Sequence, residues 1–240
     1  MNVLTAPFRP AVEGDTYRTL VFLAAAVPFG AAALALLIAG WTASEREWVR
    51  VAPDRLAQVA ASLVRNGVSA VPTLALHEAI GRLGDADLKS DSALSSVPPA
   101  VVSDEWNPAA VVARNGWTPA ILLDFKRALP VQQQFVQRFA RAGGRVVAGT
   151  DAPQPYVVPG LSLHRELQLL VASGLSPAAA IRSATVDAAD LLGVSDRAGS
   201  VAVGKAADLL VVDGDPLADI WATTRIVLVV RTGRVVYRAP

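Results

Sequence analysis

Apolar and polar residues follow one another along this chain in blocks that predict alternating helices and strands. Residues 53–67 begin with Pro53 and Asp54 and end at Gly67, which are start and stop signals of a helix. Their apolar positions recur at the spacing of one helix face: Leu56, Val59, Ala60, Leu63 and Val64. Residues 68–76, VSAVPTLAL, are short and β-rich and predict a buried strand. Helix, glycine and strand in this order are typical of an α/β unit.

The same unit recurs further along the chain. Residues 82–119 are polar and rich in turn-forming residues, and they predict a long loop rather than one continuous helix. Residues 130–144 predict a second helix, and residues 145–151, RVVAGTD, predict a second strand in which Gly149 lets the backbone approach a neighbour closely. Asp151 is then a carboxylate at the C-terminal end of a strand, which is where the chemistry of (β/α) barrels gathers.

Two further helices are expected after this strand. Residues 160–174 and residues 176–193 both have helical periodicity, and each run ends at a glycine. Ser176 is expected to cap the second helix, because a proline follows it at the first helical position.

The C-terminal tail changes to a β pattern. Short strands are expected within residues 199–216 and 225–237. Turns are expected to divide them at residues 204–205 and 232–233, with Lys205 as a turn residue rather than a phosphate ligand, because the glycine spacing of a phosphate-binding loop is missing.

A long apolar segment stands at the N-terminal side of these units. Residues 19–44 contain no charged residue, and the apolar stretch 20–41 is about long enough to cross a bilayer at ~1.5 Å per residue. We interpret it as a candidate transmembrane helix with Trp41 at the interface, which would make the protein membrane-associated. The alternatives are a buried helix in a larger core, which would leave the protein cytoplasmic, and a long signal sequence.

Composition narrows the function classes. The formal net charge is +1, from 22 Lys and Arg against 21 Asp and Glu, so no long-range field favours a nucleic-acid partner. The chain has no cysteine, which excludes disulfides, thiol nucleophiles and cysteine-type zinc sites. His77 and His164 are the only imidazoles in the sequence.

Several runs together resemble the C-terminal portion of the metal-dependent amidohydrolase superfamily, in particular its imidazolonepropionase-like and prolidase-like members. These runs are VPTL at 71–74, AGTDAP at 148–153, LHRELQLLVASGLSPAAAIRSAT at 163–185, LLG at 191–193 and GSVAVGKAADLLVVDGDPL at 199–217. The resemblance implies a distorted barrel flanked by a small β-sandwich. We therefore expect an α/β fold: a partial TIM-type (β/α) barrel with C-terminal β-sandwich strands, plus an N-terminal apolar helix. The expected domains are 1–47, 48–195 and 196–240.

The resemblance also implies a site. Asp151 corresponds to the carboxylate on the last barrel strand, which in the family ligates a divalent metal, usually zinc, and accepts the proton of the metal-bound water. Without the family, Asp151 is equally a turn-capping residue. His77 and His164 are candidate substrate-binding residues. The alternatives are a solvent-facing or loop position for His77 and a structural hydrogen bond for His164.

This sequence departs from the family in its other ligands. The His-x-His pair, the lysine or acid of the fourth strand and the histidines of the fifth and sixth strands have no counterpart, and the six strands that carry them would precede about residue 48. We therefore expect a truncated chain that is inactive by itself, related to hydrolases of non-peptide or dipeptide C–N bonds. A small amide or cyclic amide is the expected substrate if a partner chain supplies the missing strands. The alternatives are a membrane-anchored, non-catalytic interaction module and a fragment without function.

Overall fold

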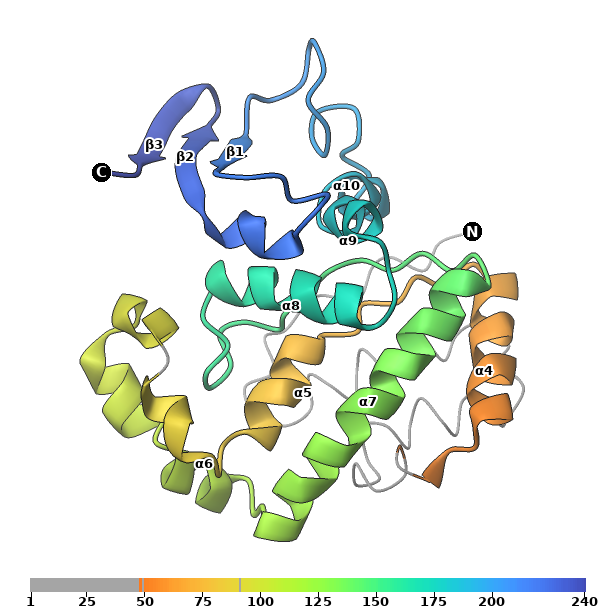
Figure 1. Ribbon diagram of the computed structural model, residues 1–240, viewed down its shortest axis with the longest axis vertical. Coiled ribbons are helices and arrows are strands. Elements are labelled where there is room, and N and C mark those ends of the chain that lie inside the picture. The colour runs from red at the N-terminus through yellow and green to blue at the C-terminus, as the bar shows by residue number, and fades with distance from the viewer. Residues whose placement is uncertain (1–47, 49, 91) are drawn as a thin grey trace, which may run out of the picture.

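A computed structural model describes residues 48, 50–90 and 92–240 (Figure 1). The candidate transmembrane helix at 20–41 lies outside these residues and stays a prediction. Within the described part of the chain, no helix combines the length and apolar character needed to cross a membrane. Figure 1 shows helices α4, α5, α7 and α8 in one body, with a small sheet on the far side of α8.

Helix α4, Pro53–Arg65, forms as its pattern predicts and turns its apolar face inward. That face packs against α7 (Pro119–Arg141), and the main core also includes residues of α5 (Leu74–Gly81) and α8 (Leu161–Ala172). The fully buried members of this core include Ala60, Leu74, Phe139, Leu170 and Ala180.

Two predicted boundaries in this region are wrong. The strand expected at 68–76 is limited to a single parallel bridge between Ala70 and Val146, and helix α5 already begins at Leu74. Helix α7 begins at Pro119, well before the expected 130–144, because the Thr118 side chain accepts a hydrogen bond from the Ile121 N–H and caps it.

The bridge nevertheless places the two expected strands side by side. The Ala70 N–H donates to the Arg145 carbonyl at 2.9 Å, and the Val147 N–H donates to the Ala70 carbonyl at 2.9 Å. This pattern is parallel, so both stretches end at the same edge of the molecule.

The polar stretch between α5 and α7 contains only short helical turns, as the sequence predicts. They pack in two small clusters around Leu88 and Trp106. Trp106 is buried and its ring contacts Tyr156. The elements are two 3-10 helices, Ala86–Ser90 and Ser92–Ser96, a π-helix at Val101–Glu105, and helix α6, Pro108–Arg114.

Beyond α8 the chain forms two short helices instead of the one predicted at 176–193. These are α9, Pro177–Ser183, and α10, Val186–Leu191. Ser176 caps α9 as expected, accepting from the Ala179 N–H. The break falls at Thr185, whose φ of −128° and ψ of −91° are not helical.

The tail is a three-stranded antiparallel sheet in the order β1-β2-β3. The 3-10 helix η4 (Ile220–Thr224), between β1 and β2, packs against α8. The turn at 232–233 joins β2 to β3 as predicted, and Lys205 lies in a turn with its Nζ on Ser200 Oγ at 2.7 Å. No strand forms between residue 199 and the turn at 204–205, so the strand expected on that side of the turn is wrong. The strands are Leu209–Val212, Ile226–Arg231 and Arg234–Arg238.

Candidate functional site

Asp151 follows Val146, which forms the parallel bridge with Ala70, but the strand expected at 145–151 does not extend beyond that bridge. The φ of Asp151 is 56°, in the left-handed region, and Thr73 at the end of the neighbouring stretch has a φ of 48°. The left-handed conformation is uncommon in residues other than glycine, although aspartate tolerates it better than most. Residues in such conformations cluster at functional sites. Thr73 and Asp151, which follow the two bridged stretches, therefore both have an unusual backbone conformation.

Gly149 explains how the two stretches come so close. A Cβ built at position 149 would lie 2.5 Å from Val71 Cγ1, which is inside van der Waals contact. The sequence predicted a close approach at this glycine, and its partner is the neighbouring stretch.

We expect Gly149→Ala to destabilise the protein by about 1–2 kcal/mol, because the added methyl overpacks against a β-branched side chain with little χ1 freedom. Urea unfolding would measure this loss, and Val71→Ala in the same chain should restore most of it. Equal losses in the single and double variants would contradict the proposed contact.

His77 does not occupy a loop, which corrects that interpretation of the sequence. It lies on α5 and faces α7, where its Nδ1 is 3.1 Å from Gln132 Nε2 and its ring centroid is 5.9 Å from that of Phe125. Gln132 itself is buried. His77 therefore helps to join α5 to α7.

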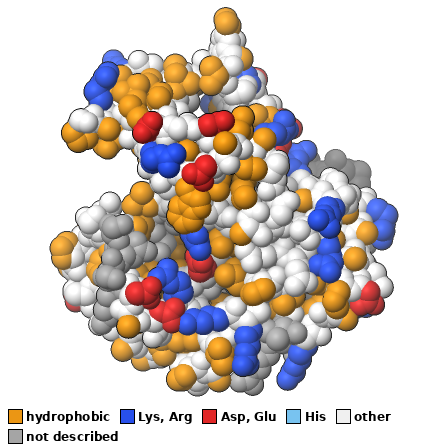
Figure 2. Space-filling model, viewed as in Figure 1, with side chains coloured by type: hydrophobic (Ala, Val, Ile, Leu, Met, Phe, Trp, Pro, Cys, Tyr) orange, Lys and Arg blue, Asp and Glu red, His pale blue; other side chains and the backbone are white. Residues whose placement is uncertain are grey.

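His164 lines a cavity of about 450 Å³ between α5, α8 and η4. Its Nδ1 is buried and has no hydrogen-bond partner among the described residues. Burial lowers the pKa of His164, which favours the neutral imidazole. Figure 2 shows this face as a hollow between the sheet side and the helical side, with acidic, basic and apolar side chains inside it.

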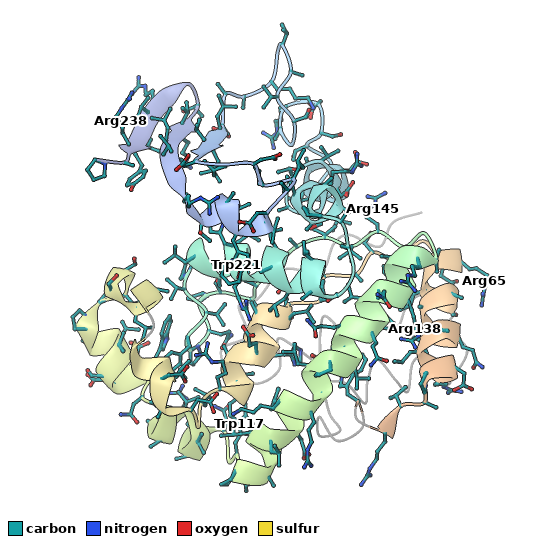
Figure 3. All side chains as sticks on the ribbon, in the orientation of Figure 1. Arg65, Trp117, Arg138, Arg145, Trp221 and Arg238 are labelled. Atoms are coloured by element: carbon teal, nitrogen blue, oxygen red, sulfur yellow. The ribbon has the colours of Figure 1, made fainter. Side chains whose placement is uncertain are left out.

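An ion pair crosses the cavity between α5 and α8. Arg165 Nε donates to Glu78 Oε2 at 2.7 Å, Arg165 Nη2 donates to Glu78 Oε1 at 2.5 Å, and Nη1 donates to Gln168 Oε1 at 3.1 Å. The hydrogen bond to Glu78 raises the pKa of Arg165. The guanidinium carbon lies 6.0 Å from the centroid of the Trp221 ring, which Figure 3 places next to α8.

Glu166, the next residue on α8, is fully buried. Its Oε2 accepts a hydrogen bond from the Ala75 N–H, in the first turn of α5, at 2.8 Å. The N-cap residue of α5, Thr73, makes no side-chain capping hydrogen bond. Burial raises the pKa of Glu166 to about 7, although the N–H groups of Ala75 and Leu74 lower it. Glu166 therefore acts as the N-terminal cap of α5 from a distant part of the chain.

A comparison with protein-family models matches residues 118–236 to the amidohydrolase family. The C-terminal portion of this chain belongs to the amidohydrolase family. The matched residues include α7, Asp151, His164 and the strands of the small sheet. A comparison with curated protein sequences gives no match.

Solved amidohydrolase-type structures share this fold. A Xaa-Pro dipeptidase with methionine bound in its active site is 23% identical with a TM-score of 0.52, over 76% of this chain and 37% of that chain. A prolidase complexed with N-methylphosphonate-L-proline is 23% identical with a TM-score of 0.54, over 76% of this chain and 38% of that chain. An amidohydrolase is 24% identical with a TM-score of 0.53, over 78% of this chain and 43% of that chain. This chain spans about two fifths of the length of these relatives.

The family is generally metal-dependent, and the residues of this amidohydrolase region can be tested against that requirement. Among the residues that the structure describes, no group of three histidine, cysteine, aspartate or glutamate side chains could hold a metal ion. Both histidines of the sequence are described, one beside Gln132 and the other in the cavity. The described residues therefore do not fit a catalytic metal by themselves.

The sequence patterns did not predict the roles of Glu166, which caps α5, and Glu78, which pairs with Arg165. Glu166 stands three residues after Leu163 and four before Leu170, so a charged residue on the apolar helix face was the available signal. The Glu78–Arg165 pair joins residues 87 apart, and no local pattern predicts it.

Proposed function

We propose that this chain is part of an amidohydrolase-type hydrolase that cleaves C–N bonds in small amides, cyclic amides or dipeptides. The observation that carries the proposal is the position of Asp151. This carboxylate follows a stretch in parallel pairing with Ala70, has a left-handed backbone conformation, and lies within the residues matched to the family. Those features support a barrel origin, in which catalytic groups stand at the C-terminal ends of parallel strands.

The proposal includes a second polypeptide. Because the described residues do not form a metal-ligand group, we propose that a partner chain supplies the remaining strands and ligands, and that this chain is inactive alone. The division into 1–47, 48–195 and 196–240 belongs to this proposal, with 48–195 as the barrel-derived part.

The two histidines take different places in the proposal. His164 supports a role in ligand binding, because its unpartnered Nδ1 belongs to a residue lining a cavity. His77 is proposed as a substrate-binding residue only through the family resemblance, and its contact with Gln132 favours a role in helix packing.

The test compares the complete chain isolated under mild conditions, with whatever binds it, and the same chain after a high-salt wash. Zinc content and hydrolysis of Xaa-Pro dipeptides are measured in both. We expect both signals in the mild preparation, their loss after the wash, and their loss in Asp151→Asn. The exposed carboxylate of Asp190 on α10 provides the matched control, Asp190→Asn, which should change neither signal.

A mild preparation with neither metal nor hydrolysis would contradict the enzyme proposal and favour the second candidate, a non-catalytic interaction module. The observation that favours this candidate is the small sheet, whose strand β3 is exposed at every residue. Apolar side chains on this sheet are about half exposed: Leu210 at 49%, Val235 at 52%, Val236 at 60% and Tyr237 at 47%. Exposed apolar strands with a free edge are typical of association surfaces.

A further inference from the structure

The cavity between α5, α8 and η4 has the composition of a small-molecule site. Its volume of about 450 Å³ lies in the range of ligand pockets, which are apolar with a few polar groups that fix orientation. His164 lines this cavity and Asp151 does not, so a ligand bound here shares only that histidine with the proposed hydrolysis. Its apolar walls include Ala75, Ala79, Leu88, Val158, Leu161 and Trp221.

Three charged side chains line the cavity, and two of them are cations: Glu78, Arg82 and Arg165. Glu78 and Arg165 satisfy each other through two hydrogen bonds. Bidentate pairs of this kind are strong and geometrically fixed. The cavity lining therefore keeps one positive charge beyond this pair, on Arg82.

Arg82 is paired with two acids. Its Nη2 donates to Asp87 Oδ2 at 3.1 Å, and its Nε is 4.0 Å from Asp85 Oδ2. The Asp87 side chain is 72% exposed, and Asp85 also pairs with Lys126. Because exposed ion pairs contribute little, an anion entering the cavity can replace Asp87 on Arg82.

Trp221 supplies a flat apolar surface in the cavity lining. It is 54% exposed, and the Arg165 guanidinium lies 6.0 Å from its ring centroid. Nearby His164 adds a neutral imidazole, because burial lowers its pKa. Among the described residues, the lining thus combines an aromatic side chain with a guanidinium that is paired with Asp85 and the exposed Asp87, and its acid, Glu78, is paired with Arg165.

We propose that this cavity binds a small monocarboxylate with a flat apolar body. The carboxylate contacts Arg82 and the apolar body packs against Trp221 and Leu88. Arginine matches a carboxylate with paired N–H donors, and an aromatic wall removes the apolar body from water.

The experiment titrates the complete chain with phenylacetate and, separately, with phenylacetamide, following binding by NMR. The two probes have nearly the same shape, and only the first is an anion. We expect phenylacetate to bind at least about tenfold more tightly than phenylacetamide, because a charge-assisted hydrogen bond is about twice as strong as a neutral one. Equal affinity of the two probes, or no saturable binding of phenylacetate up to about 10 mM, would overturn the proposal.

Two variants locate the site. Arg82→Gln should weaken phenylacetate about tenfold and leave phenylacetamide nearly unchanged, whereas Trp221→Leu should weaken both. Arg127→Gln, on the exposed side of α7 and outside the cavity lining, is the matched control and should change neither affinity. The same loss in Arg127→Gln as in Arg82→Gln would show unspecific charge attraction and sink the assignment.

Discussion

Glu166→Gln is expected to stabilise the protein by about 3 kcal/mol at pH 8 while changing its stability little at pH 4. Burial is the largest cause of the raised pKa of Glu166, and the charge of Glu78 adds to it. The folded protein therefore holds a proton on Glu166 up to about pH 7, whereas the unfolded chain releases it near the ordinary value of 4.5. Glutamine is uncharged and still offers a carbonyl oxygen to the Ala75 N–H.

The direction of the pH dependence follows from that difference. Between about pH 4.5 and 7 the folded state binds more protons than the unfolded state at this group, so its contribution to stability falls as the pH rises and is constant above 7. Urea unfolding from pH 4 to pH 8 would show this slope in the natural sequence and a smaller one in Glu166→Gln. Glu105→Gln, at an exposed glutamate, is the control and should keep the slope. A slope that survives in Glu166→Gln would contradict the assignment.

Gly144→Ala is expected to destabilise the protein by about 2–3 kcal/mol. A Cβ at position 144 would overlap the edge of the Phe139 ring, and Phe139 is fully buried in the main core. A ring in a close-packed core has no space into which to move, so the backbone before the Ala70 bridge must shift.

A double-mutant cycle with Phe139→Leu isolates this contact, because the shorter side chain removes the overlapping ring edge. Gly144→Ala should cost much less in the Phe139→Leu background, as measured by thermal or urea unfolding. Gly84→Ala is the matched control, since its Cβ would meet only Leu122 Cδ1 at 3.8 Å, and we expect it to be nearly neutral. Additive losses in the cycle would refute the overlap.

Local sequence patterns predicted the structure correctly where one short segment contains all of the deciding residues. Helix α4 has its start signals, its apolar spacing and its stop within one run, and all appear as predicted. Ser176 likewise caps α9, and the turn at 232–233 joins β2 to β3. In each case the deciding interactions join residues a few positions apart.

The sequence also predicted the close approach at Gly149, but the second expected strand, like the first, is limited to the bridge between Ala70 and Val146. It gave too long a first strand, because an apolar run such as 68–76 has the same pattern as a strand or as the start of a buried helix. The start of α5 at Leu74 coincides with the Glu166 contact at its first turn, 91 residues away.

The sequence by itself determined helix α4, the Ser176 cap of α9, the turn at 232–233 and the family resemblance. Only the tertiary structure decided where α5 begins, which cations line the cavity, and that Glu166 is buried with a raised pKa. The physical reason is range: capping, periodicity and turn chemistry act between near neighbours, whereas burial and ion pairing depend on which distant segments pack together. Glu78 and Arg165 become a site only when α5 and α8 meet.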